Sequence, residues 1–188
     1  LVVAGYASNG VDYDFGVVRY NPDGSLDGTF GTGGKVMTNF LSRNDAATAI
    51  LLLPDGRIVA AGYVSNGLNH DFGVARYNAN GSLDGSFDVD GKVVTDIAGA
   101  TDVSWSAMLD PDEKIIVAGY SFGSSYDIAI ARYTSNGSLD TSFSGDGIVL
   151  TNLGGSRDEG TAVVRQPDGK IVVAGHSAGD FALARYSS

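Results

Sequence analysis

The sequence of 188 residues contains no cysteine, so it has no disulfide framework, no thiolate nucleophile and no zinc site built from cysteine ligands. No apolar run approaches the roughly 20 residues of a membrane-spanning helix, and we expect no membrane insertion. Basic residues are few: 12 Lys and Arg stand against 22 Asp and Glu, and they are spread along the chain. Because phosphate neutralisation supplies most of the affinity for nucleic acids, we expect no nucleic-acid partner.

Proline is also scarce, at 4 residues, whereas glycine is abundant, at 27. This is about twice the usual glycine share of roughly 7%. With so little proline, the glycines indicate tight turns and close packing and not a disordered tract. Apolar residues make up 43% of the chain, which is enough to bury a core. The sequence begins at Leu1, inside a strand pattern, and we expect it to be a fragment or a processed form.

The chain is organised as a repeat. The segment 71–77, Asp-Phe-Gly-Val-Ala-Arg-Tyr, has near-copies at 14–20, 127–133 and 180–186. An Ala-Gly pair recurs at 4–5, 61–62, 118–119 and 174–175, so the intervals are 57, 57 and 56 residues. A fixed period close to this length is typical of solenoids, propellers and related arrays.

Each period has the pattern of strands alone. In the second copy we expect strands at 46–53, 57–63, 71–77 and 91–97, with a Pro-Asp-Gly turn at 54–56 and an Asn-Gly turn at 80–81. No segment has the sustained apolar period near 3.6 of an amphipathic helix. Four short antiparallel strands are the content of one propeller blade. We therefore predict an all-β fold: a partial or small β-propeller of four-stranded antiparallel blades with a 56–57-residue repeat.

The repeat also predicts the blade boundaries within a single array, 1–188. Blade one spans 1–43 and lacks its first strand, blades two and three span 44–100 and 101–156, and blade four spans 157–188 and lacks its last strand. Each blade of a repeat array buries its faces only against its neighbours. We therefore expect further repeats of the same parent chain, pairing of the first and last blades, or a second copy to close the ring.

Alternation along the third strand predicts how the blades stack. Phe72 and Val74 point to one face, and Gly73 and Ala75 to the other. The other copies keep this rule. A sheet between two others is apolar on both faces, so we expect the bulky side chains of one blade to fill the space beside the small ones of the next.

Several spaced elements recur together: A-G-Y, D-F-G-V-A-R-Y-N, N-G-S-L-D-x-S-F, G-K-V and P-D-G-K-I. This pattern resembles the bacterial delta-60 repeat family, and the resemblance covers the whole chain. It implies a propeller-like array in a large exported or surface protein, hence an extracellular or cell-surface location, and it transfers no activity. Two positions depart from the pattern: Glu113 replaces the turn glycine, and Ile148 replaces the lysine of Gly-Lys.

Periodic charges predict a structural ion pair in every blade. An arginine recurs on the bulky strand face, where an unpaired charge would cost several kcal/mol. The arginines are Arg19, Arg76, Arg132 and Arg185. Two equally periodic aspartate sets could be their partners: Asp45, Asp102 and Asp158, which we favour as the structural set, or Asp27, Asp84 and Asp140.

The acidic turns at 21–27 and 88–91 superficially resemble calcium loops. Neither contains the bidentate Glu that an EF-hand loop requires, and their Asn-Gly or Asp-Gly pairs are also what a tight hairpin turn demands. If the chain binds calcium through either turn, Asp88 and Asp90 are the best candidates. We expect no other cofactor.

The sequence offers little for catalysis, and we predict no catalytic residue. His70 and His176 occupy non-equivalent repeat positions, and no Gly-x-Ser-x-Gly elbow is present. The carboxylates fall at repeat spacing in turns, which explains them structurally. A glycosidase pair stays open, because such a pair depends on separation in space.

Residues that break the repeat are the candidates for ligand binding. Trp105 stands where the other first strands have Thr48 and Thr161, so it either lines a channel mouth as a stacking surface or fills space. The loops between second and third strands vary most, and loops on a rigid scaffold are where recognition usually lies. With Trp105, the candidates on these loops are Tyr13, His70, Phe122 and Tyr126.

These observations favour a non-catalytic propeller segment of an exported or surface bacterial protein that binds or displays a protein or a glycan. A propeller hydrolase or lyase acting on polysaccharide is the alternative, and a structural spacer is a second alternative. Carboxylates and histidine clustered at one channel mouth would favour the enzyme. Aromatic residues along the loop rim would favour binding.

Overall fold

The structure, a computed structural model, describes residues 1–187, and these form fourteen strands and no helix. The strands are β1 (Val2–Ser8), β2 (Tyr13–Arg19), β3 (Lys35–Thr38), β4 (Ala46–Leu52), β5 (Ile58–Ser65), β6 (His70–Tyr77), β7 (Lys92–Thr95), β8 (Thr101–Leu109), β9 (Ile115–Phe122), β10 (Tyr126–Tyr133), β11 (Ile148–Thr151), β12 (Asp158–Arg165), β13 (Ile171–Ser177) and β14 (Asp180–Tyr186). A search of these residues for a helix long and apolar enough to cross a membrane found none.

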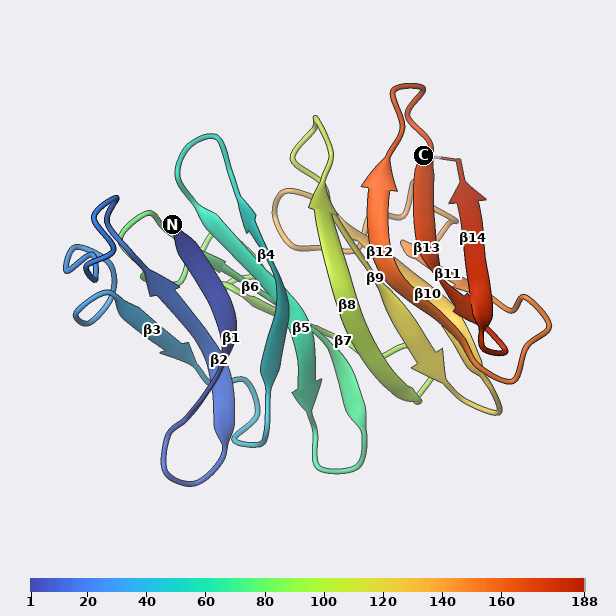
Figure 1. The fold of residues 1–188 in the computed structure, drawn as a ribbon, viewed down its shortest axis with the longest axis horizontal. Helices are drawn as coiled ribbons and strands as arrows, with labels where there is room; N and C mark the ends of the chain where they lie inside the picture. The colour runs from blue at the N-terminus through green and yellow to red at the C-terminus, as the bar shows by residue number, and fades with distance from the viewer. Residues whose placement is uncertain (188) are drawn as a thin grey trace.

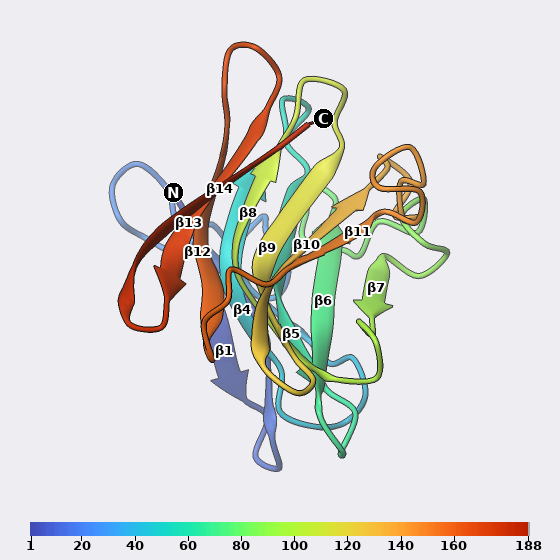
Figure 2. The same ribbon diagram turned by 90° about the vertical axis from the view of Figure 1, so that its right-hand side faces the viewer.

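The strands form four antiparallel meanders. Two are four-stranded, β4-β5-β6-β7 and β8-β9-β10-β11, and two are three-stranded, β1-β2-β3 and β12-β13-β14. They stand side by side in chain order, from the blue first sheet to the red last sheet (Figure 1). Figure 2 views this row from the end of the last sheet, with the short strands β7 and β11 toward one side. The predicted fold class, all-β with propeller-like antiparallel sheets, is confirmed.

The sheets stack through large side chains packed on small ones, as alternation along the third strand predicts. Phe72 and Val74 of β6 lie in one buried cluster with Ala129 and Ala131 of β10. A second cluster joins the first two sheets, with Phe15 and Val17 packed near Ala60 and Ala75, and a third joins the last two, with Ile128 and Ile130 near Val163 and Val173. Three dry seams therefore hold the four sheets together.

The recurring Ala-Gly pair has a steric cause. A Cβ on Gly62 would lie 1.9 Å from the carbonyl oxygen of Ala46, and one on Gly119 or Gly175 would come as close to Val103 or Glu159. Beside each of these glycines the neighbouring first strand bulges by one residue. A bulge brings its strand closer to its neighbour, and only glycine leaves room for it.

A tyrosine at the end of the third strand connects each sheet to the one before it. The hydroxyl of Tyr77 donates to Thr38 at 2.8 Å, and Tyr133 and Thr95 are 2.7 Å apart across the next seam. Tyr186 and Thr151 repeat the contact at 3.0 Å. Burial raises the pKa of Tyr77 to about 12, so the hydroxyl stays protonated at neutral pH.

Candidate functional site

Aromatic side chains gather where the second strand of each sheet turns into the third. The β-ladder sets Ser8 opposite Tyr13, so Tyr6, two residues earlier, lies on the same face as Tyr13. Their rings meet edge to face at 5.3 Å between centroids. The second hairpin repeats this pair with Tyr63 and His70 at 5.1 Å, and the third with Tyr120 and Tyr126 at 5.0 Å. We call these three pairs, together with Phe122, the aromatic rim.

A pocket of about 370 Å³ opens on the rim between the first two sheets. The rings of both hairpins line it together with three residues from the start of the second sheet. The lining residues are Tyr6, Tyr13, Asn44, Asp45, Ala46, Tyr63 and His70. This size is at the lower end of small-molecule sites, and the mixture of rings and a few polar groups is typical of them. The pocket brings Tyr13 and His70, two predicted binding residues, to one place.

The other three predicted binding residues meet on the third sheet. Trp105 is the extra residue of the β8 bulge, at the position held by Thr48 and Thr161 in β4 and β12. Its side chain is 40% exposed, with its ring 6.4 Å from that of Tyr120. The rings of Phe122 and Tyr126 are 4.4 Å apart.

Sequence reasoning missed Tyr6, Tyr63 and Tyr120, because each stands in the A-G-Y repeat and was interpreted as part of the scaffold. The position of these tyrosines within the predicted hairpin could have identified them. Each tyrosine lies a fixed distance before the second turn, so antiparallel pairing places it beside the aromatic residue at the start of the third strand. A repeated residue can therefore line a site.

Asp45 supplies the only carboxylate among the described residues that line this pocket, and both of its oxygens are already engaged. Oδ1 accepts the backbone N–H of Ser65 at 3.1 Å, and Oδ2 accepts that of Phe40 at 3.1 Å. Burial outweighs these hydrogen bonds and raises the pKa of Asp45 to about 6. The geometry shows a side chain that ties the connection between sheets one and two to the second hairpin.

Asp102 and Asp158 play the same part at the later junctions. Asp102 Oδ2 accepts the N–H of Ile97 at 2.6 Å, and Asp158 Oδ2 accepts that of Leu153 at 2.6 Å. Burial raises the pKa of Asp102 to about 6. The favoured pairing of Asp45, Asp102 and Asp158 with the arginines is therefore wrong, since no ion pair joins them within residues 1–187. Their backbone donors take the place of the expected cations.

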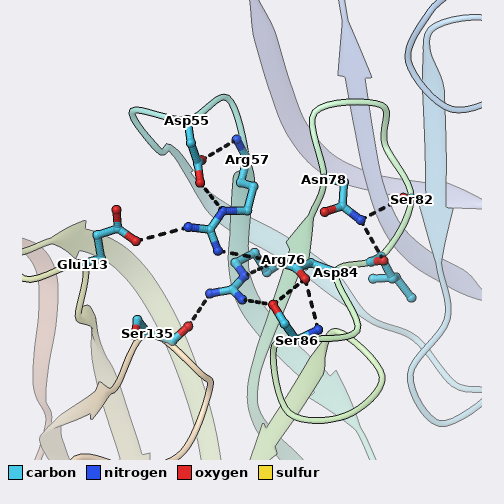
Figure 3. Close-up of polar contacts among 10 residues, drawn as sticks. Asp55, Arg57, Arg76, Asn78, Ser82, Asp84, Ser86, Glu113 and Ser135 are labelled. Atoms are coloured by element: carbon cyan, nitrogen blue, oxygen red, sulfur yellow. Dashed lines mark hydrogen bonds and ion pairs between the residues drawn. The ribbon is translucent and has the colours of Figure 1, made fainter.

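The arginines pair instead with the other periodic set. Arg76 Nε lies 2.7 Å from Asp84 Oδ2, and its other nitrogens donate to Ser86 Oγ and to the carbonyl oxygen of Ser135 on the next sheet (Figure 3). The guanidinium also lies 4.7 Å from the ring centre of Phe87. Arg19–Asp27 and Arg132–Asp140 repeat the ion pair at 2.8 Å. We call each such group an outer clasp.

A second cation reinforces the clasps of the complete sheets. Arg57 bonds to Asp55, lies 3.5 Å from Asp84, and reaches Glu113 of the third sheet at 3.1 Å (Figure 3). The third sheet repeats this second contact with Lys114, which lies 2.8 Å from Asp140 of the same sheet. Arg185 is exposed, and no ion pair to it is found in the described part of the chain. The position eight residues after Arg185 falls beyond the sequence.

Two acidic groups bear on a possible cation. Asp88 and Asp90 lie exposed on a turn, where Asp90 Oδ1 accepts the N–H of Lys92 at 3.0 Å. Within residues 1–187, one set of three acidic side chains could place its oxygens around an ion: Asp71, Asp96 and Asp102, which offer carboxylate oxygens within 4.8 Å of one another. They stand at the junction between the second and third sheets, next to the rim.

The remaining hollow has no aromatic lining among the described residues, whereas the remaining histidine belongs to a charged group beside the rim. A hollow of about 590 Å³ on the outer side, between the first two sheets, has no aromatic residue in its described lining, which includes Lys35, Met37 and Asn80. His176 Nε2 lies 3.6 Å from Glu159, which also pairs with Arg157 at 2.5 Å. The guanidinium of Arg157 in turn lies 5.0 Å from the ring centre of Tyr126, so this charged group adjoins the rim at the third sheet.

Comparison with known proteins agrees with this architecture. A family model described as a domain of unknown function (DUF5122) beta-propeller matches residues 1–30, 53–87, 111–143 and 166–188, together more than half of the chain. Among solved structures, the chain is similar to a protein of unknown function from Bacteroides caccae, with 13% identity and a TM-score of 0.52. The match covers 94% of this chain and 56% of that one, so this chain spans about half its length. No curated protein matches the chain.

Proposed function

Since this chain belongs to the DUF5122 beta-propeller family, whose function is unknown, we propose that it is a non-catalytic binding scaffold whose aromatic rim takes a glycan. The observation that carries the proposal is the repetition of an aromatic pair on three consecutive sheets, on the same face of each hairpin. The resemblance to bacterial delta-60 repeats supports an exported or surface protein, where glycans are abundant ligands.

The chemistry of the rim fits a sugar ring. A pyranose has an apolar C–H face that packs on an aromatic ring and a rim of hydroxyls that need hydrogen-bond partners. Tyr6 is 65% exposed and Tyr13 is 48% exposed, so the first pair offers open ring surface. The neighbouring His70 and Asn44 add polar groups within the pocket. Exposed aromatic side chains with convergent polar groups are the usual composition of a binding site.

The repeat spacing favours a polymer over a single small molecule. One pair stands on each of three sheets, and the third also carries Trp105 and Phe122. A ligand with repeating units can contact one pair per sheet, and linked contacts raise overall affinity without any new type of contact. An extended glycan therefore uses more of this rim than a monosaccharide does.

The glycosidase alternative requires two carboxyl groups on either side of the ligand. One observation favours it: Asp45 has a raised pKa and lines the pocket beside His70, as a catalytic acid would. Against it, Asp45 is the single described carboxylate in the lining, and both of its oxygens accept backbone N–H groups. Binding without turnover therefore agrees better with the geometry.

The face of the last sheet that points away from the third sheet is a surface on which a further partner could pack. Phe181 is 76% exposed and Leu183 58% exposed on β14, whereas the equivalent Ile128 and Ile130 of β10 are buried. We infer that another sheet of the same kind covers this face, either a further repeat of the parent chain or a second copy. A dimer in sedimentation that dissociates on Phe181→Asp would identify the second copy, and a monomer would exclude it.

The binding proposal is tested on the intact chain. A glycan array selects ligands, and calorimetry then measures their affinity for the wild type and for Tyr6→Ala and Tyr63→Ala, each of which removes one ring that lines the pocket. We expect a loss of about fivefold to 150-fold in affinity, as removal of a stacking ring costs on the order of 1 to 3 kcal/mol in other aromatic stacking platforms. Leu68→Ala is the matched control, because Leu68 is 98% exposed on the same hairpin as His70 and does not line the pocket.

Four outcomes would contradict the proposal in different ways. A ligand whose affinity is unchanged by both tyrosine variants binds elsewhere. Release of reducing sugar that stops in Asp45→Asn would establish the hydrolase. An array without any binder, combined with capture of a defined peptide ligand that depends on the same tyrosines, would assign the rim to protein recognition, and no ligand of either class would leave the structural spacer.

A further inference from the structure

We propose that the junction between the second and third sheets binds one calcium ion through Asp71, Asp96 and Asp102. The three residues come from the start of β6, the connection after β7, and the start of β8. Each offers one carboxylate oxygen, and these oxygens lie within 4.8 Å of one another. This site is independent of the glycan proposal, because it needs no ring of the aromatic rim.

The other two junctions show what this position does without an ion. There the residue equivalent to Asp96 is an asparagine. Asn39 Nδ2 donates to Asp14 Oδ1 at 2.9 Å, and Asn152 Nδ2 donates to Asp127 Oδ1 at 2.8 Å. In both flanking junctions, an amide hydrogen therefore satisfies the aspartate that begins the third strand.

The middle junction keeps the geometry and loses the donor. Asn39 Oδ1 accepts a backbone N–H from Ser42, and Asp96 Oδ1 accepts the equivalent turn donor, the N–H of Gly99, at 2.8 Å in each case. With one oxygen of Asp96 held in the same way, its second oxygen takes the place of the asparagine amide. An acceptor thus replaces a donor beside Asp71.

Asp71 shows the consequence. Its side chain is 3% exposed, and Oδ2 accepts from Asn66 at 2.9 Å, as Asp14 Oδ2 accepts from Asn9. Its Oδ1, however, has no hydrogen-bond partner among the described residues. A buried carboxylate oxygen without a donor costs free energy, and the missing donor marks a place for a positive charge.

Asp102 completes the set. It is fully buried, and its Oδ1 also lacks a partner in the described part of the chain. The same is true of Asp158 Oδ1 at the next junction, so this atom alone does not distinguish the site. What distinguishes the middle junction is the combination with Asp71 Oδ1 and the second carboxylate of Asp96.

The donor set selects the ion. Three carboxylates, without histidine or cysteine, are ligands for a hard cation. Within the described residues none of the three forms an ion pair with Lys or Arg, so no side-chain cation already occupies this role. Asp96 is exposed and leaves one side open to water, while the other two are buried. Calcium accepts six to eight oxygens in irregular geometry, whereas magnesium demands a regular octahedron and dehydrates reluctantly. We therefore assign calcium.

The test is a calcium titration of the chelator-treated chain at pH 7.5 by calorimetry, with magnesium as the comparison ion. We expect one calcium bound per chain, weaker magnesium binding, and a rise of several degrees in the unfolding midpoint at saturating calcium, because an ion that binds only the folded state stabilises it. The decisive variant is Asp96→Asn, which reproduces the residue of the two flanking junctions and should fold for that reason.

Asp96→Asn should lose at least about tenfold in calcium affinity and should have a higher midpoint than the wild type when calcium is absent, since the amide then donates to Asp71. Asp90→Asn is the matched control: it removes the same charge from an exposed turn of the same sheet and should bind calcium as the wild type does.

Three results would overturn the assignment. Absence of calcium binding to the wild type would mean that a proton shared between the carboxylates takes the role of the asparagine hydrogen. Undiminished binding to Asp96→Asn would place the ion elsewhere. Loss of binding in Asp90→Asn but not in Asp96→Asn would place it on the turn of Asp88 and Asp90.

Discussion

The two sides of each boundary between sheets treat the same residue type in opposite ways. On the outer side, Asp84 faces the guanidinium of Arg76 within a clasp that also includes Ser86. On the rim side, Asp45 is almost fully buried and has backbone N–H donors but no cation. Burial raises the pKa of Asp84, but hydrogen bonds from Ser86 and the charge of Arg76 outweigh it and lower the value to about 2. At Asp45 burial dominates, and the pKa is about 6.

The difference shows that a periodic carboxylate takes its chemistry from its partner and not from its position in the repeat. The clasps hold fixed, compensated charges that stabilise the stack. The rim side holds carboxylates whose charge is poorly compensated, close to the aromatic pairs and to the proposed calcium site. Function is therefore expected on the rim and stability on the outer side, and three experiments examine this division.

The largest effect is expected from breaking a clasp. Asp84→Ala should lower the free energy of unfolding by about 3 to 5 kcal/mol, because it leaves the buried guanidinium of Arg76 without its counter-charge. Chemical denaturation with wild-type and variant chains measures the difference. Asp27→Ala is the matched control, since Arg19 and Asp27 form the same pair at about one-fifth exposure, and its loss should be much smaller because solvent screens the pair. Equal losses would show that burial does not decide the strength of the clasp.

A smaller effect is expected from pH. Asp45 has a folded pKa near 6, above its ordinary 3.8, so it contributes stability that is fully present below pH 3.8 and is lost as the pH rises through 6. Asp84 has a folded pKa near 2, so its contribution is present above pH 3.8 and is lost as the pH falls through 2. In Asp45→Asn the decline in unfolding free energy between pH 4 and pH 7 should be shallower than in the wild type.

The control for this experiment is the loss of stability at acid pH. Asp45→Asn should keep the wild-type loss of stability between pH 4 and pH 2, because that window belongs to the clasps. Parallel curves for the two chains from pH 4 to pH 7 would mean that Asp45 titrates near its ordinary value and that the rim carboxylates are better compensated than their contacts indicate.

The smallest effect is expected at Glu113 of the third sheet, which contacts Arg57 of the second sheet on the outer side of the stack. Glu113 occupies the left-handed region at φ 58°, in the place of the turn glycine, and pairs with Arg57 at 3.1 Å. Glu113→Gly relieves about 1 to 2 kcal/mol of backbone strain and removes an exposed ion pair of about 0 to 1 kcal/mol. A net gain between zero and about 2 kcal/mol is therefore expected in thermal unfolding. Gly56→Ala, the reverse change at φ 87°, should be destabilising, and a loss in Glu113→Gly would show that the ion pair outweighs the strain.

The architecture could be predicted because it depends on local repeated patterns. The alternation of Phe72 and Val74 with Gly73 and Ala75 predicted both faces of β6, and the seam clusters confirm it. The sequence alone shows that Trp105 stands at the position of Thr48 and Thr161 and breaks the repeat there. It does not show that all three residues occupy a β-bulge. The bulge depends on backbone pairing with the neighbouring strand, and the order of side chains along one strand carries no information on that pairing.

The site was only partly predictable. Two aspartate sets with the same period were available to the arginines, and the choice between them depends on a loop that brings Asp84 back toward Arg76. Sequence analysis did not single out Asp96. The residue is informative only by comparison with Asn39 and Asn152, whose amides donate to a neighbouring carboxylate. A residue-by-residue comparison between repeats could have found it from the sequence.

The outermost strands β3, β7 and β11 are four residues long, whereas the strands that they pair with have seven or eight. The edges formed by β3, β7 and β11 therefore expose few unpaired backbone groups to a passing molecule. Short edges of this kind limit the addition of strands from other chains. In a chain that is 43% apolar by composition, the broad faces of the sheets, and not these short edges, are then the surfaces on which sheets of the same kind pack.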